Sequence, residues 1–252
     1  MITAYPMFGK SKSLEICRAF VAGCGGIVAK DARQLLDGPA FFYGVNESNL
    51  HLWRQAEKDL RRDYFYADNA YFDKSRQQYF RVTRNRLQHS GSGQSDGTRF
   101  AALGIPISPW KTDGTHIVVC PQSAAFMRDV VGRPDDWLEV TLLTLRHVTS
   151  RPLLVRQWER DKTSLAATLA HDLERAYALV TWSSAAAVSA LLAGVPVIVS
   201  DRCAAFRLSG SFQAIEYLPR PTRETWAGVL ADNQWTLNEM RSGEAWAKLN
   251  GE

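Results

Sequence analysis

Two adjacent serines, Ser183 and Ser184, are the residues whose type and position best suit binding chemistry. An apolar run at residues 178–182 predicts a strand and residues 184–192 predict a helix of small side chains, so the serines occupy the turn between them. Backbone N–H groups at a helix start lack partners and carry partial positive charge. With Ala185 leaving room for close approach, the turn fits a diphosphate. The same residues also fit a core helix with an ordinary serine N-cap.

A carboxylate, Asp68, follows a second apolar run at residues 64–67. Ligands of open α/β sheets bind beyond the carboxyl ends of parallel strands, where this side chain would lie. Asp68 is therefore our candidate for a catalytic base or nucleophile, with Tyr71 close to the acceptor. The alternative is a turn in which Asp68 caps the strand end together with Asn69.

Basic side chains concentrate in two places. In the first half they are Lys58, Arg61, Arg62, Lys74, Arg76, Arg81, Arg84 and Arg86. They form either a solvated face or a phosphate-contacting surface, and on the second reading Arg81 and Arg84 bind the acceptor. In the second half, Arg156, Arg160 and Lys162 are candidates for neutralising a nucleotide phosphate.

Alternating apolar runs and amphipathic stretches predict the elements that position these residues. In the first half, strands are predicted at residues 2–5, 27–29, 40–45, 64–67 and 79–83, and helices at 10–22 and 49–60. In the second half, strands are predicted at 116–120, 152–156, 178–182 and 196–200, and helices at 124–130, 135–149, 163–173 and 184–192. Residues 88–98, rich in Ser and Gly, predict a flexible loop.

This order predicts an α/β fold of two Rossmann-like halves with mostly parallel sheets and a C-terminal helical tail. The expected domains are residues 1–105 on the acceptor side, 106–221 for a nucleotide sugar, and 222–252 as helices that pack back toward the first domain. Trp226, Trp235 and Trp246 would supply apolar area for that packing.

Composition excludes several other classes of protein. The 252 residues are 46% hydrophobic and 22% charged, which is typical of a globular chain. No apolar run approaches the roughly 20 residues that a membrane span needs, so we expect a cytoplasmic protein.

Four scattered cysteines favour neither a zinc knuckle nor disulfides. Because GxGxxG, Walker and HExxH motifs are absent, nothing favours a dehydrogenase, an NTPase or a zinc hydrolase, and we expect no metal and no cofactor. The net charge of +4 permits a polyanionic partner.

The segment around the two serines resembles the donor-domain signature of GT-B glycosyltransferases, especially the capsule Kdo-transferase and related polysaccharide families. The matching residues are Ser183, Ser184, Ala190, Leu191, Leu192, Gly194, Pro196 and Val197. The resemblance implies a metal-independent transferase whose co-substrate is a nucleotide sugar, with the serines facing the donor phosphates. In these families a strand is followed by a loop with a Lys or Arg and then Pro-His-Pro. Arg156 takes the position of that basic residue, whereas the Pro-His-Pro is absent here. Asp68 takes the place of the acidic residue at the transfer centre, and Glu216 that of an acidic residue on a donor hydroxyl.

The closing stretch, residues 223–249, is similar to uncharacterised phage proteins, which would place the protein in the host cytoplasm. That resemblance favours a hydroxymethylated pyrimidine in DNA as the acceptor, reached by flipping the base out of the duplex. The capsule resemblance favours a surface glycan as the alternative. Because the sequence contains no amphipathic membrane anchor that would bring the protein to a lipid-linked acceptor, we predict the DNA acceptor. Two further alternatives are a non-catalytic binding module of the same fold and a sugar-nucleotide epimerase.

Overall fold

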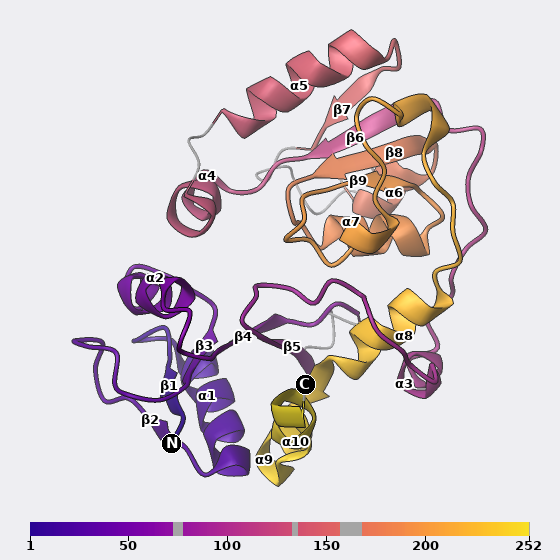
Figure 1. Cartoon of the computed structure of the whole chain (residues 1–252). Helices are drawn as coiled ribbons and strands as arrows, with labels where there is room; N and C mark the ends of the chain where they lie inside the picture. Colours follow the sequence, from indigo (N-terminus) through magenta and orange to yellow (C-terminus); the bar gives the residue numbers. More distant parts are fainter. Residues whose placement is uncertain (73–77, 133–135, 157–167, 252) are drawn as a thin grey trace. The chain divides into compact units, whose positions relative to one another are not determined.

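The computed structural model describes residues 1–72, 78–132, 136–156 and 168–251 (Figure 1). The chain divides into two compact units, one of residues 1–89 with 230–252 and one of residues 90–229. Each contains its own sheet with helices, so the predicted α/β class with mostly parallel strands is confirmed. The segments 1–105, 106–221 and 222–252 stay a prediction of functional domains, as does a GT-B arrangement of the two units.

The first unit is built on a six-stranded sheet. Its order is β10 (Gln234–Thr236), β5 (Tyr79–Arg84), β4 (Tyr64–Asn69), β3 (Ala40–Tyr43), β1 (Thr3–Tyr5) and β2 (Ile27–Val28). β2, β1, β3 and β4 are parallel, whereas β5 and β10 are antiparallel. Because β1 lies between β2 and β3, the strand order reverses there. The carboxyl ends of β1, β3 and β4 share one edge of the sheet, and Asp68 lies at that edge.

The C-terminal segment completes the core of this first unit. The helices of the unit are α1 (Ser11–Cys24), α2 (Leu50–Lys58), α9 (Leu237–Ser242) and α10 (Glu244–Gly251). Phe20 of α1 stacks on Phe41 with ring centroids 4.1 Å apart, and Trp246 of α10 meets Phe65 edge-on at 5.3 Å. The sequence predicts only helices beyond residue 222, which is wrong for β10. A three-residue strand shows no detectable period, and its pairing with β5 is what defines it.

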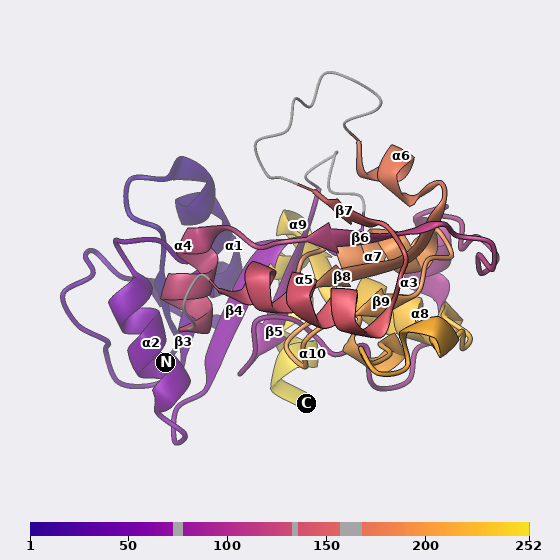
Figure 2. The same cartoon turned by 90° about the horizontal axis from the view of Figure 1, so that it is seen from above.

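The second unit is built on four parallel strands in the order β7 (Leu153–Val155), β6 (His116–Cys120), β8 (Ala176–Thr181) and β9 (Val197–Ile198) (Figure 2). Its helices are α3 (Thr98–Ala102), α4 (Ala124–Phe126), α5 (Trp137–Val148), α6 (Leu169–Leu173), α7 (Ala186–Leu192) and the start of α8 (Glu224–Asp232). All four predicted strands are present. Because β7 and β8 flank β6 on opposite sides, the order reverses at the β6–β8 pair, where α/β proteins place ligands.

A glycine two residues beyond α7 turns the chain toward β9. Gly194 follows the helix with φ +76°, and an added Cβ would lie 2.0 Å from the carbonyl oxygen of Pro109. Only glycine meets both conditions, so the chain turns here into β9.

Two predictions about residues 88–131 differ from the structure, and a third, the helix at residues 163–173, lies partly outside the described residues. Residues 88–98 are not a free loop, because the backbone of Gly91 packs on the Trp226 indole and a short helix, α3, begins at Thr98. The predicted helix 124–130 consists of one α-helical turn followed by the π-helical turn Met127–Val131. Residues 163–167 of the predicted helix 163–173 lie outside the described part of the chain, and the described part contains α6, whose N-cap is Thr168. Across the described chain, no helix has both the length and the apolarity to span a bilayer.

Candidate functional site

The strand-reversal point of the second unit brings together the segments that follow β6 and β8. Thr181, the last residue of β8, donates its hydroxyl to the carbonyl of Cys120, the last residue of β6, at 2.6 Å. Gln122 and Ser183 therefore emerge side by side at the carboxyl edge of the sheet. This is the edge where the sequence predicts the nucleotide sugar to bind.

Three donors of the serine turn converge on one oxygen atom. With its amide oriented to satisfy hydrogen bonding, Gln122 Oε1 accepts from the Ser183 hydroxyl at 2.9 Å, from Ser184 N at 3.1 Å and from Ser183 N at 3.3 Å. Ser183 is buried, and Ser184 Oγ accepts from Ala186 N at 3.2 Å. Ala185 directly precedes α7. The turn thus has the donor geometry expected for an anion, but a side-chain amide oxygen occupies it here.

The basic residue predicted beside the serines is held by a carboxylate that the sequence analysis did not single out. Arg156 follows β7, at the same edge of the sheet, and its guanidinium forms an ion pair with Asp172 of α6. The Asp172 side chain is 2% exposed and that of Arg156 is 21% exposed. Two further candidates, Arg160 and Lys162, lie outside the described residues. The buried Asp172 therefore fixes the orientation of the Arg156 guanidinium, while part of the Arg156 side chain stays exposed to solvent.

Glu216 lies at the opposite edge of this sheet. It forms an ion pair with Arg151 at 2.9 Å and accepts from the Thr149 hydroxyl at 2.5 Å, and both partners precede β7. Arg151 also donates to the carbonyl of Gly114, which precedes β6. These hydrogen bonds and the nearby positive charge lower the pKa of Glu216. The structure therefore does not bring Glu216 together with Ser183, because the strands separate the two ends.

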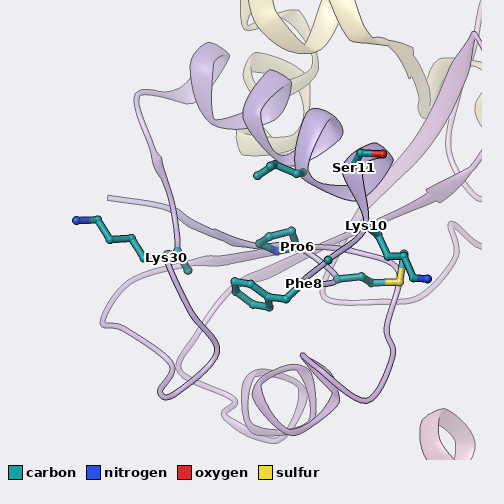
Figure 3. Close-up of a pocket in the computed structure, with 9 residues that line it drawn as sticks. Pro6, Phe8, Lys10, Ser11 and Lys30 are labelled. Atoms are coloured by element: carbon teal, nitrogen blue, oxygen red, sulfur yellow. The ribbon is translucent and has the colours of Figure 1, made fainter.

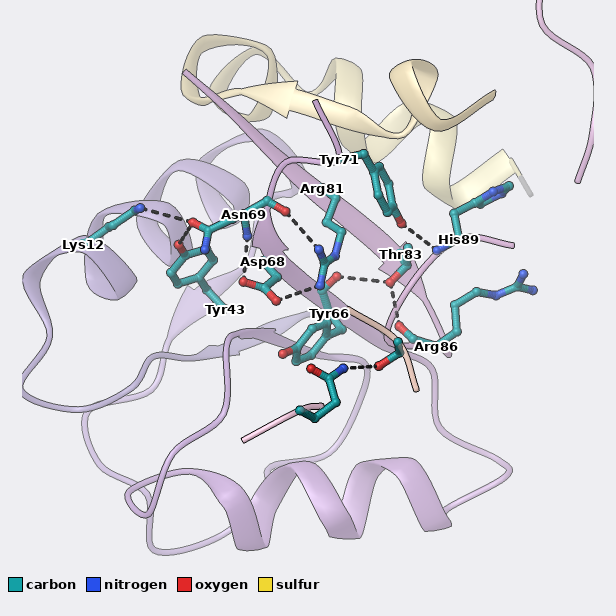
Figure 4. Close-up of polar contacts among 12 residues, drawn as sticks. Lys12, Tyr43, Tyr66, Asp68, Asn69, Tyr71, Arg81, Thr83, Arg86 and His89 are labelled. Atoms are coloured by element: carbon teal, nitrogen blue, oxygen red, sulfur yellow. Dashed lines mark hydrogen bonds and ion pairs between the residues drawn. The ribbon is translucent and has the colours of Figure 1, made fainter. Parts of the chain in front are cut away.

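In the first unit, Asp68 and Arg81 form a close pair (Figure 4). They are directly opposite each other on β4 and β5, and Arg81 Nη2 lies 2.7 Å from Asp68 Oδ2. The other carboxylate oxygen accepts from Asn69 N at 2.7 Å. The Arg81 side chain is 7% exposed and that of Asp68 is 34% exposed. One face of the carboxylate is thus fixed while the group still reaches solvent.

Aromatic side chains surround this pair. The ring of Tyr71 lies 5.4 Å from the Arg81 guanidinium, so three of the predicted residues are brought together. Burial and the charge of Asp68 raise the pKa of both Tyr66 and Tyr43 above the usual range, whereas Arg81 lowers it. Both phenols therefore keep their protons at neutral pH and can only donate or accept hydrogen bonds.

Arg84 does not join Asp68. It pairs with Phe65 at the opposite end of β4, three residues along β5 from Arg81, and its guanidinium binds Asp63 at 2.8 Å. Neighbouring positions of a strand face opposite sides of the sheet, so a separation of three residues reverses the direction of the side chain. The predicted acceptor site is thus divided, with Tyr71 and Arg81 in one place and Arg84 in another.

A cavity of about 220 Å³ lies at the carboxyl ends of β1 and β2 (Figure 3). Its lining is Pro6, Met7, Phe8, Gly9, Lys10, Ser11, Leu14, Ala29 and Lys30. The wall is mostly apolar, and Lys10 and Lys30 lie on opposite sides of it. No sequence prediction points to this cavity.

No group of three or more His, Cys, Asp or Glu side chains suited to a metal occurs within the described ranges. The polar residues that sequence reasoning missed are Gln122 and Asp172. The signal for Gln122 is its place two residues beyond a buried strand, but only the strand order shows that this strand neighbours β8. Asp172 carries no such signal, because an acidic residue on a short helix is ordinary.

Two solved structures have a fold similar to that of this chain. The chain is similar to a solved structure of KpsC from Thermosulfurimonas dismutans, a beta Kdo 2,7 transferase, with a TM-score of 0.53 and 13% identity over 98% of this chain and 99% of that chain. The chain has a glycosyltransferase-like fold. A KpsC beta Kdo 2,4 transferase from the same organism gives a TM-score of 0.50 and 12% identity over 93% and 92%.

No protein-family model matches the sequence, and no curated protein matches it. At 12–13% identity the two structures show the fold alone. They agree with the predicted resemblance to capsule Kdo-transferases at that level. The predicted relationship to phage proteins gains no support from them.

Proposed function

We infer that the protein is a glycosyltransferase that moves a sugar from a nucleotide-activated donor to an acceptor hydroxyl. The feature that carries this proposal is the packing of the Gln122 amide against the serine turn: with the amide oriented to satisfy hydrogen bonding, Ser183 N, Ser184 N and the Ser183 hydroxyl converge on its oxygen atom. This convergence lies at the strand-reversal point of a sheet, in a chain that shares its fold with two Kdo transferases over almost its whole length. Donors arranged around one oxygen are what a phosphate oxygen requires.

On the donor side, the Gln122 side chain turns away and a phosphate oxygen of the nucleotide takes the place of its amide oxygen. The two backbone N–H groups are fixed by the turn into α7, so little rearrangement accompanies the build-up of charge on the leaving phosphate. Arg156, oriented by Asp172, adds a positive charge at the same sheet edge. Glu216 has no part in this proposal, because it lies at the other end of the strands.

On the acceptor side, the Asp68 carboxylate accepts the proton of the acceptor hydroxyl as that oxygen bonds to the anomeric carbon. The bond from the anomeric carbon to the phosphate oxygen breaks, and its electrons leave with the nucleotide. Arg81 fixes the orientation of the carboxylate, and a positioned base of this kind typically contributes about 10²–10⁴-fold to the rate. The buried Tyr71 supports Arg81 from its other side.

The acceptor that we propose is a sugar hydroxyl of a surface glycan. The two similar structures are named as Kdo transferases, and together with the resemblance of the serine segment to capsule families they favour a glycan acceptor over DNA. A hydroxymethylated pyrimidine in DNA, the acceptor that the sequence favoured, has no support from them. Arg84, which the sequence predicts to bind the acceptor, forms an ion pair with Asp63 and lies away from Asp68.

Calorimetric titration with a panel of nucleotide sugars tests the donor site. One donor should bind saturably, and Ser183→Ala should weaken it about tenfold or more, since a hydrogen bond to a charged group is worth about 1.5–3 kcal/mol. Ser242→Ala is the matched control, because among the described residues its hydroxyl bonds to Glu239 and Glu244, close to it in the chain. Failure of every donor to bind, or equal affinities for the two variants, would contradict the proposal.

A second candidate function is a binding module without catalysis. It is favoured by the way Gln122 fills the serine turn and Arg81 and Asn69 engage the Asp68 carboxylate. Mass spectrometry separates the two candidates. An enzyme transfers the sugar of the bound donor slowly to water and faster to an acceptor, and free nucleotide appears in both cases. A binding module leaves the donor intact.

A further inference from the structure

A polar pocket, separate from the apolar cavity at the ends of β1 and β2, lies at the end of β5. It has a volume of about 300 Å³ and is lined by Arg84, Asn85, Arg86 and His89. All four residues follow one another closely in the chain and belong to the first unit. Neither the serine turn nor the Asp68 carboxylate contributes to the lining.

A dense set of hydrogen bonds fixes the wall of this pocket. Asn85 sits at φ +55°, a conformation that asparagine tolerates, and exchanges two hydrogen bonds of 2.8 Å with the backbone of Tyr64. Thr83 donates its hydroxyl to the carbonyl of Arg86 at 2.6 Å. At the far end, His89 N donates to the hydroxyl of Tyr71 at 2.6 Å (Figure 4). A segment held at both ends presents its side chains with little conformational freedom left to lose on binding.

The charges around the pocket leave an excess of positive charge. The carboxylate of Asp63 neutralises Arg84 at 2.8 Å, and Asp232 lies 3.7 Å from the ammonium group of Lys248. Within the described part of the chain, no carboxylate pairs with the exposed guanidinium of Arg86. The side chains of Arg86 and His89 extend to the same side of their segment in Figure 4.

The pKa of His89 is lowered in this positively charged environment. Burial, together with the charges of Arg86 and Lys248, lowers its pKa to about 4, so the ring is neutral at physiological pH. A neutral imidazole offers one N–H donor beside the guanidinium groups of Arg84 and Arg86. Planar guanidinium forks match the oxygens of phosphate, to which they donate pairs of hydrogen bonds.

We propose that this pocket binds a phosphate group, either as inorganic phosphate or as part of a phosphorylated small molecule. Arg86 supplies the charge, Arg84 and His89 supply further donors, and the hydrogen-bonded turn at Asn85 holds all three in place. The cavity is at the lower limit of the size of ordinary small-molecule sites, which leaves room for a sugar attached to the phosphate. Phosphate binding at this pocket does not depend on the proposed sugar transfer, so each proposal can be tested separately.

The test follows the imidazole signals of the five histidines by NMR while inorganic phosphate is added at constant ionic strength. His89 should shift saturably, and its pKa should rise by one or more, because a bound anion favours the protonated ring. Arg86→Gln should weaken phosphate binding at least tenfold. Arg33→Gln, which removes an arginine that is 88% exposed outside the pocket, should leave binding unchanged.

Glucose 6-phosphate in a parallel titration distinguishes the two sources of the phosphate group. Tighter binding than that of inorganic phosphate assigns the pocket to a phosphorylated small molecule, and equal or weaker binding assigns it to the free anion. A shift of His89 that stays linear in phosphate concentration, or equal affinities for Arg86→Gln and Arg33→Gln, would overturn the proposal. Neither result depends on donor binding or on transfer, so failure of the proposed function would be visible separately.

Discussion

Arg81 and Asp68 face each other across neighbouring antiparallel strands, with 2.7 Å between guanidinium and carboxylate. The arginine is almost fully buried, whereas about a third of the aspartate side chain is exposed. This asymmetry means that Arg81 orients Asp68 from within the protein and leaves its outer face for a ligand.

If Asp68 is the base of a sugar transfer, Asp68→Asn should lower the transfer rate by about 10²–10⁴-fold, because an amide cannot take up the proton. Donor affinity, measured by calorimetry, should stay within about twofold, since Asp68 belongs to the other compact unit from the serine turn. Asp31→Asn, at an exposed carboxylate, serves as the control. An Asp68→Asn variant with normal turnover would exclude the proposed role.

Replacing Gln122 should strengthen donor binding. In the free protein its amide oxygen satisfies three donors that a phosphate would use, so the donor must displace it. Gln122→Ala removes this competitor, and one net hydrogen bond of about 1 kcal/mol corresponds to a roughly fivefold lower Kd. Weaker binding in the titration would instead mean that the Gln122 amide contacts the donor directly.

The ion pair of Arg156 and Asp172 should respond unequally to loss of either partner. Arg156→Gln removes a positive charge from beside a carboxylate that is 2% exposed, and breaking a buried ion pair from one side typically costs about 3–5 kcal/mol. Asp172→Asn leaves a partly exposed guanidinium, so its cost should be smaller. Urea unfolding of both variants gives the comparison, and equal costs would contradict the burial asymmetry on which this prediction depends.

Acid should destabilise the protein through His89. The pKa of this ring is about 4 in the folded state and about 6.5 when unfolded, so the unfolded chain binds the proton more tightly. The contribution of the neutral ring is fully present above pH 6.5 and is lost as the pH falls from 6.5 to 4. Each tenfold change in proton affinity is worth about 1.4 kcal/mol. His89→Gln should therefore flatten the unfolding free energy across this pH range, as read from denaturation curves.

Two glycines of the 88–98 segment allow the cost of backbone strain to be separated from the cost of a clash with Trp226. Gly91 and Gly97 both have positive φ, +73° and +75°, so alanine costs each about 1–2 kcal/mol in backbone strain. At Gly91 the new methyl would also lie 2.2 Å from Cδ1 of Trp226, whereas at Gly97 it meets open space. Gly91→Ala should therefore lower the melting temperature clearly more than Gly97→Ala does. Equal losses would mean that the segment does not pack on Trp226.

The sequence by itself determined most of the strands and helices of an α/β protein, because burial imposes a period that can be read locally. The short elements β10 and α3 were not among them. The sequence also placed Ser183 beyond one buried strand and Asp68 at the end of another. What it could not determine is which strands are neighbours, since pairing is decided by contacts between residues far apart in the chain. Gln122 reaches the serine turn only because β6 pairs with β8, about sixty residues further along.

The tertiary structure also decided which predicted residues belong together. Arg81 and Arg84 look alike in sequence, yet the alternation of side chains along β5 sends one to Asp68 and the other to the pocket with Arg86. Glu216 is separated from Ser183 because parallel strands place their amino and carboxyl ends at opposite edges. The three tryptophans of the closing stretch have different partners as well. Trp235 lies in the core of the first unit and the partly buried Trp246 packs against that core, whereas Trp226 contacts Gly91 in the second unit. A local pattern fixes the direction and burial of a side chain, but its partners depend on the packing of the whole unit.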